Sequence, residues 1–153
     1  MRSDGVLRRL RKYRLGFDGR GLLLFLAVML PNFIWFAVPA PADVLRKASV
    51  TSRLDAAAGV CQVLLAALLV CAVNQERPKR RSVLPAAACL CYYAAWLAYY
   101  QGMAGPAVLL ALSLFPCAAF LLFEIGRGNF IAVIPTAAFS VCHLLSSVIN
   151  FIL

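Results

Sequence analysis

Five polar side chains follow the last apolar segment of the chain at spacings of 4, 3, 4 and 3 residues: Thr136, Ser140, His143, Ser147 and Asn150. On an α-helix this spacing places all five on one face. Hydroxyl, imidazole and amide groups avoid lipid, so we expect this face to point toward other helices or toward water. His143 is the only histidine of the chain, and it is the one group at this depth that titrates near neutral pH.

The other apolar segments also carry polar groups near their middle. Counting inward at about 1.5 Å per residue puts Asn32, Gln62, Ser113 and one of two adjacent tyrosines, Tyr92 or Tyr93, near the depth of His143. Two interpretations stay open: hydrogen bonds between packed helices, or a solvated site that binds a ligand. The candidate ligand-binding residues are Asn32, Gln62, Ser113, Thr136, Ser140, His143, Ser147 and Asn150.

These residues do not match a known catalytic pattern. His143 has serines as helical neighbours, but the chain lacks Gly-x-Ser-x-Gly and a buried acid to orient the ring. It also lacks His-Glu-x-x-His, paired carboxylates, a phosphate loop and a dinucleotide fingerprint. The six cysteines lie inside apolar segments without metal-ligand spacing, so we expect them to be packing residues. The sequence therefore predicts neither an enzyme nor a cofactor or metal site.

The chain also lacks an acidic or basic residue at mid-membrane depth. Asp55 and Glu124 are expected at helix ends, Asp55 in capping-box spacing with Ser52 and Glu124 paired with Arg127. Proton- and cation-driven carriers usually need an intramembrane carboxylate. A pump of that kind is therefore not expected.

The composition identifies the solvent that surrounds these segments. Of the 153 residues, 63% are apolar and 14% charged, whereas soluble proteins are about half apolar and about a quarter charged. Continuous apolar runs predict helices, not the alternating strands of a barrel. The predicted fold class is all-α: an integral membrane helix bundle in which residues 21–153 form a single domain. Its five transmembrane helices are expected at about 21–38, 54–73, 83–100, 106–123 and 130–153.

The distribution of basic residues predicts the orientation in the membrane. With the N-terminus inside, twelve of the fifteen lysines and arginines are cytoplasmic and three are external. The C-terminus is then external. An alternative is a secretory signal cleaved before Asp43, which would remove the first helix and leave four.

Residues 1–20 form a basic tail ahead of the first helix. Val6, Leu10, Tyr13 and Phe17 share one side of a helical wheel. The basic residues cover the rest of the wheel: Arg8, Arg9, Arg11, Lys12 and Arg14. This pattern is typical of an amphipathic helix on anionic inner-leaflet lipids; a topology signal on a mobile tail or a docking site for an acidic partner are the alternatives. Nucleic acid is not an expected partner, because the basic residues lie at the ends of apolar segments.

Residues 30–36, LPNFIWF, interrupt the first apolar segment. Pro31 leaves the carbonyl of Ala27 without its helical donor, and in lipid this carbonyl needs a substitute. We expect a kink that turns Asn32 toward the last helix. LPNFIWFAVPAP and, later, GNFIAVIPTAAFSVCHLL resemble small uncharacterised bacterial polytopic membrane proteins, with a Leu-Pro-Asn/Trp first span and a histidine in the last. The resemblance implies residence in the bacterial inner membrane and transfers no functional residue.

Two function classes follow from these patterns. The first is a non-enzymatic membrane subunit or accessory protein that packs against a membrane-protein partner or a second copy as a homodimer. It predicts a dry polar layer whose members bond to one another. The alternative is a small carrier or ligand-binding component for a neutral or amphipathic solute. It predicts a water-accessible pocket lined by Asn32, Gln62 and His143.

Overall fold

The computed structural model describes residues 12–41, 43–76 and 82–153. Within these ranges lie five α-helices, α2 (Gly19–Ala37), α3 (Ser52–Cys71), α4 (Leu84–Tyr100), α5 (Pro106–Arg127) and α6 (Phe130–Phe151), a 3-10 turn η1 (Val44–Arg46), and the short strands β1 (Tyr13–Leu15) and β2 (Ala72–Asn74). The all-α prediction is confirmed. Four of the helices, α2, α3, α5 and α6, are long and apolar enough to cross a membrane. This is compatible with a multi-pass membrane protein.

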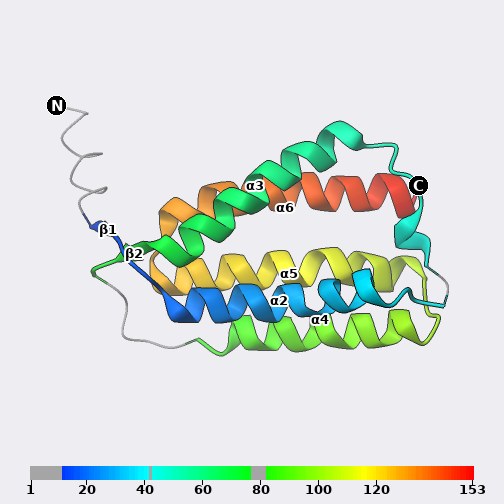
Figure 1. Ribbon diagram of the computed structural model, residues 1–153, viewed down its shortest axis with the longest axis horizontal. Coiled ribbons are helices and arrows are strands. Elements are labelled where there is room, and N and C mark those ends of the chain that lie inside the picture. Colours follow the sequence, from blue (N-terminus) through cyan, green and yellow to red (C-terminus); the bar gives the residue numbers. More distant parts are fainter. Residues whose placement is uncertain (1–11, 42, 77–81) are drawn as a thin grey trace.

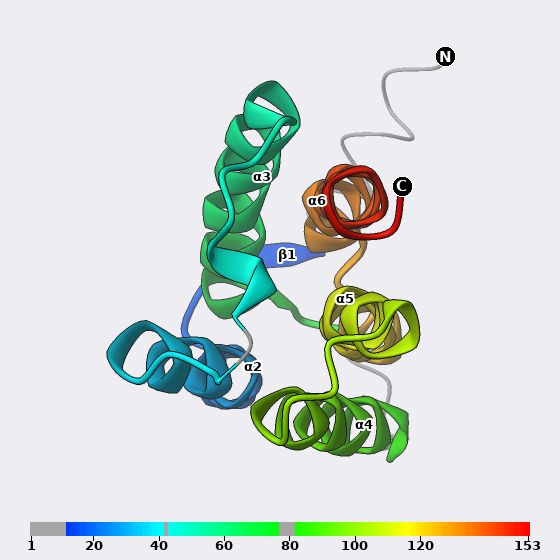
Figure 2. The same ribbon diagram turned by 90° about the vertical axis from the view of Figure 1, so that its right-hand side faces the viewer.

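The helices lie side by side along the long axis of the molecule (Figure 1). Viewed from one end they form an open ring in the order α3, α6, α5, α4, α2 (Figure 2). Packing is most extensive between α4 and α5, between α3 and α6, and between α5 and α6, whereas α2 is packed more lightly. We call the end that carries β1 and β2 the ribbon end, and the end that carries residues 38–51, residues 101–105 and the C-terminus the far end.

At the ribbon end, residues Tyr13–Leu15 of the tail form the strand β1 and are not part of the predicted amphipathic helix. β1 pairs antiparallel with β2, with Tyr13 opposite Asn74. The Tyr13 hydroxyl donates to the carbonyl of Gly128 at 3.0 Å, and Lys12 forms an ion pair with Glu76 at 2.5 Å. The prediction was wrong here because β2 supplies the backbone with partners that a helical wheel does not consider. Arg8, Arg9, Arg11, Val6 and Leu10 lie outside the described residues; Arg14 is exposed.

The predicted end of the fourth helix at about residue 123 is also wrong. α5 continues to Arg127 and ends at Gly128, whose φ of 64° is the left-handed conformation that favours glycine. Arg127 does not pair with Glu124 but with Asp18, at 2.7 Å. Glu124 is fully buried and accepts a 2.7 Å hydrogen bond from Thr136. The helix extends because Glu124 and Arg127 make tertiary contacts with Thr136 and Asp18, whereas hydropathy alone assigns these charged residues to a loop.

The backbone carbonyl that Pro31 leaves without a helical donor receives a hydrogen bond from α4. The hydroxyl of Tyr93 donates to the free carbonyl of Ala27 at 2.6 Å. The side-chain amide of Asn32 donates to the carbonyl of Val28 at 3.1 Å and to the hydroxyl of Tyr92 at 2.9 Å. Asn32 therefore faces the interior of the bundle, and its hydrogen bond to another helix goes to Tyr92 of α4 and not to α6.

This arrangement predicts a coupling between Tyr93 and Pro31. Replacing Tyr93 with phenylalanine leaves the Ala27 carbonyl without a donor and is expected to lower the free energy of unfolding by about 1 kcal/mol. In a Pro31→Ala background the restored backbone N–H can bond to Ala27, so the same replacement should cost clearly less. Unfolding in mixed micelles of the four proteins of this double-mutant cycle measures the difference. Equal costs in both backgrounds would contradict the assignment.

Candidate ligand-binding cavity

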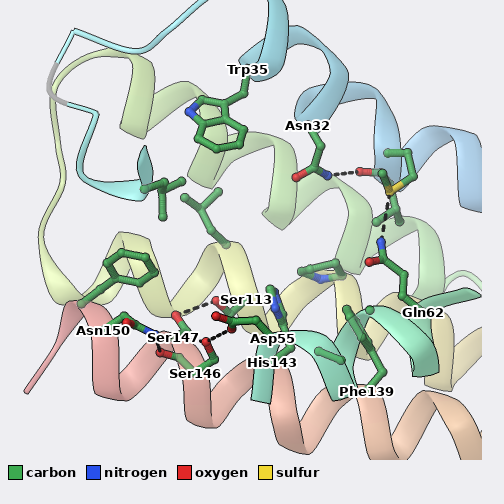
Figure 3. Close-up of a pocket in the computed structure, with 18 of the residues that line it drawn as sticks. Asn32, Trp35, Asp55, Gln62, Ser113, Phe139, His143, Ser146, Ser147 and Asn150 are labelled. Carbon is green, nitrogen blue, oxygen red and sulfur yellow. Dashed lines mark hydrogen bonds between the residues drawn. The ribbon is translucent and has the colours of Figure 1, made fainter. Parts of the chain in front are cut away.

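A cavity of about 460 Å³ lies between the helices in the half of the bundle nearer the far end. All five helices contribute to its wall, and so does the segment that joins α2 to α3. Six of the eight candidate residues line it: Asn32, Gln62, Ser113, His143, Ser147 and Asn150. Figure 3 shows them on opposing walls, with His143, Ser113 and Ser147 close together and Asn32 and Gln62 across from them. The volume lies in the range of small-molecule sites.

The other two candidates, Thr136 and Ser140, lie outside the cavity, closer to the ribbon end. The Thr136 hydroxyl donates to Glu124 and to the carbonyl of Ala132, at 2.7 and 2.9 Å. Ser140 donates to the carbonyl of Thr136 at 2.7 Å. Helical spacing correctly placed these residues on one face of α6. Only the part of that face nearer the far end, with His143, Ser147 and Asn150, lines the cavity.

The candidate residues do not form one continuous hydrogen-bonded layer. Ser113 and Ser147 bond directly, hydroxyl to hydroxyl, at 2.8 Å. The Gln62 amide donates to the sulfur of Met29 at 3.6 Å, a weak acceptor, and the ring of His143 stacks on Phe139 with centroids 5.1 Å apart. Polar side chains with such partners are available to water or to a bound molecule.

Asp55 is the residue of the cavity that sequence reasoning missed. α3 begins at Ser52, close to the predicted start at about residue 54, and Thr51, not Ser52, occupies the N-cap position. The carboxylate of Asp55 accepts from the hydroxyls of Ser146 and Ser49, at 2.5 Å each. The sequence did contain a signal for Asp55, because it lies at helical spacing from Gln62 and shares a helix face with it. Asp55, Ala58, Gly59 and Gln62 all line the cavity.

Asn150 fixes the loop at the cavity's far end. Its amide donates to the hydroxyl of Thr51 at 2.6 Å and to the carbonyl of Ser146 at 2.8 Å. Its side-chain oxygen accepts the backbone N–H of Val50 at 2.8 Å. Asn150 therefore ties the start of α3 to the end of α6 and helps to shape the wall that contains Asp55.

The arrangement of serine, histidine and aspartate is not that of a hydrolase. In a catalytic triad the serine hydroxyl bonds to histidine and the histidine bonds to the acid. Here the Ser146 hydroxyl donates to Asp55, while His143 stacks on Phe139. Among the residues that the structure describes, no cluster of three or more His, Cys, Asp or Glu side chains could hold a metal ion.

Asp43 organises the loop over the aromatic groups at the far end. Its carboxylate accepts from the indole N–H of Trp35 and the hydroxyl of Tyr99, at 2.9 Å each, and from Arg46 at 2.8 Å. The Arg46 guanidinium also lies 4.9 Å from the centroid of the Trp35 ring. Burial opposes ionisation of Asp43, but the three hydrogen bonds outweigh it, so the pKa of Asp43 lies below its ordinary value.

This lowered pKa predicts a pH dependence of the loop. The contribution of Asp43 to stability is fully present above about pH 4, the ordinary aspartate value, and is lost as the pH falls through the lower value of the folded protein. In a Trp96→Phe variant, the emission of Trp35 should change over this acidic range. The change should vanish when Asp43→Asn is added; an unaltered acid transition in that double variant would contradict the role of Asp43.

Comparisons of the chain with models of protein families, with curated proteins and with solved structures found no match.

Proposed function

We propose that this protein is a multi-pass membrane protein of the bacterial cytoplasmic membrane whose cavity binds a small amphipathic solute, as a carrier or a ligand-binding component. The observation that carries the proposal is a single cavity on which polar groups from several helices converge, Asn32, Gln62 and His143 among them. A polar-lined space inside an apolar bundle is stable when water or a ligand satisfies its polar groups.

The solute is proposed to be amphipathic because the wall is mixed. The rings of Tyr92, Trp96, Phe120 and Phe139 line the same cavity as the polar side chains. Apolar walls with a few convergent polar groups are typical of small-molecule sites. We propose binding without a chemical step, in keeping with the bonding of Ser146 to Asp55.

The proposed topology has five spans with the N-terminus inside. α4 has 17 residues, about 25 Å of helix, and it packs along the full-length helix α5. A slightly short span is accommodated by local thinning of the bilayer. The ribbon end then faces the cytoplasm, where the basic tail meets anionic lipids, and the far end is external. A reporter fused to the C-terminus should be exported.

A second candidate function is that of a subunit that packs against a membrane-protein partner or a second copy. The observation that favours it is a face of small residues on α4, of which Ala87, Cys91 and Ala94 are exposed. Small residues let membrane helices approach closely. This role is compatible with a ligand site, because Tyr92 and Trp96 reach the cavity from the opposite face of α4.

Substituted-cysteine labelling tests the ligand site. In a background without native cysteines, Asn32→Cys, Gln62→Cys and His143→Cys should react with a small aqueous thiol reagent. Thr136→Cys is the matched buried control, and Leu97→Cys, at an exposed apolar position of α4, is the lipid-facing control; both should be protected. Protection at all three cavity positions would refute the proposed ligand site and favour the subunit function.

A further inference from the structure

Two charged side chains line the cavity, and they are placed differently. Lys47 is an exposed residue of the loop at the far end, whereas Asp55 is partly buried in the first turn of α3. The positive end of the helix dipole favours an ionised carboxylate in that turn. The wall therefore carries a fixed negative charge, and the positive charge lies at the rim.

The hydrogen-bond donors to the carboxylate of Asp55 are neutral hydroxyl groups. Ser146, Ser49 and Thr51 donate to its oxygens at 2.5, 2.5 and 3.4 Å. These bonds orient and stabilise the carboxylate without neutralising it, and among the described residues Asp55 forms no ion pair with a lysine, arginine or histidine. A carboxylate without a cationic partner attracts cations electrostatically, so a counter-ion from outside the chain would complete this site.

We propose that the solute carries an ammonium group that binds beside Asp55, an inference that rests on the proposed ligand-binding function. The apolar part of the solute then lies against the aromatic rings of the wall. Tyr92 and Trp96 of α4 and Phe120 of α5 line this wall, and aromatic rings attract alkylammonium groups as well as alkyl chains. His143, beside Asp55 in Figure 3, adds no fixed charge in its neutral form.

An anionic solute fits the same cavity poorly. Its charge would enter a wall that already holds Asp55, and Lys47 at the rim would be its cationic partner. The nearby guanidinium of Arg46 is already bound to Asp43 and to the backbone carbonyl of Trp35, at 2.8 and 2.7 Å. A neutral solute gains the aromatic contacts but leaves the charge of Asp55 without a counter-ion.

Three compounds of nearly the same shape separate these classes: choline (cationic), 3,3-dimethylbutan-1-ol (neutral) and 3,3-dimethylbutanoate (anionic). The protein offers its own probe, because both of its tryptophans, Trp35 and Trp96, line the cavity. Titrations in lipid nanodiscs, followed by tryptophan emission, give the three dissociation constants. We expect choline to bind at least about tenfold more tightly than the alcohol, with the anion weakest.

The Asp55→Asn variant isolates the charge, because asparagine keeps the size and the acceptor oxygen. It should weaken choline binding by about tenfold and leave binding of the neutral alcohol unchanged; the retained alcohol binding shows that the cavity is folded. Lys47→Met, which removes the charge at the rim, should leave choline binding unchanged or tighten it.

Equal affinity of the wild-type protein for choline and the alcohol would overturn the inference of an ammonium site but leave the proposed ligand site intact. This comparison requires no variant. Choline binding that Asp55→Asn does not weaken would overturn it as well. Binding of none of the three compounds also overturns it, and the cysteine labelling then decides separately whether the cavity is a solvated site.

Discussion

Replacing Asp18 with asparagine is expected to lower the free energy of unfolding by about 3 kcal/mol, because it leaves the buried charge of Arg127 unpaired. The two side chains are 9% and 18% exposed and lie 2.7 Å apart. They connect the start of α2 to the end of α5, 109 residues apart in the chain. Asparagine preserves the size of the side chain and an oxygen that can accept the backbone N–H of Arg20. The loss of stability therefore measures the contribution of the negative charge.

The matched control is the exposed ion pair of the same end of the molecule. Lys12 and Glu76 are 43% and 64% exposed, and Glu76→Gln should change the free energy of unfolding by less than about 0.5 kcal/mol. Unfolding in mixed micelles of increasing denaturing-detergent content compares the two variants. Similar small losses for both would show that the Asp18–Arg127 pair is solvated and weak.

Replacing Gly21 with alanine is expected to destabilise the protein by about 1–3 kcal/mol. A Cβ atom at this position would overlap the backbone carbonyl oxygen of Leu69, and a backbone atom cannot move aside as a flexible side chain can. Gly21 lies at a close contact between α2 and α3, next to the hydrogen bond from the N–H of Asp18 to the carbonyl of Val70 at 2.8 Å. Beyond this point the two helices diverge toward the cavity.

Gly59 supplies the opposite control within a neighbouring helix. Nothing lies within 4 Å of a Cβ built there, so Gly59→Ala should stabilise α3 by about 0.5–1 kcal/mol through helix propensity. Thermal unfolding in the same detergent should therefore shift in opposite directions for the two variants. A shift in the same direction would mean that propensity, and not the contact with Leu69, determines the effect at Gly21.

Hydropathy was sufficient to predict where each helix lies. The predicted segment 106–123 begins where α5 begins, at Pro106, and the predicted 83–100 matches α4, Leu84–Tyr100. Apolar runs identify helices because, in lipid, the backbone of every turn must form its hydrogen bonds within the segment. The end of α5 and the strand β1 could not be predicted in this way, because contacts with distant residues determine them: Glu124 with Thr136, and β1 with β2.

The sequence predicted which helix faces line the candidate site, but it did not predict the hydrogen-bond partners of the residues in it. Helical spacing identified His143, Ser147 and Asn150 on α6, and depth identified Asn32 and Gln62, all of which line the cavity. Asp55 was assigned to a helix cap, because a first-turn acid is usually explained by the helix itself. Its actual partners, Ser49 and Ser146, come from a loop and from α6, and pairings of that kind depend on how the helices pack.

The measurement that tests the central claim most directly is sided labelling of a single cysteine at position 143. The claim is a solvated cavity that extends to the exposed residues Lys47 and Ser49 at the far end, which the proposed topology places outside the cell. A membrane-impermeant thiol reagent should modify His143→Cys in intact cells, and excess choline should slow the modification. The same reagent applied to inside-out vesicles should leave the cysteine unmodified. Modification from the cytoplasmic face alone, or from neither face, would contradict the claim.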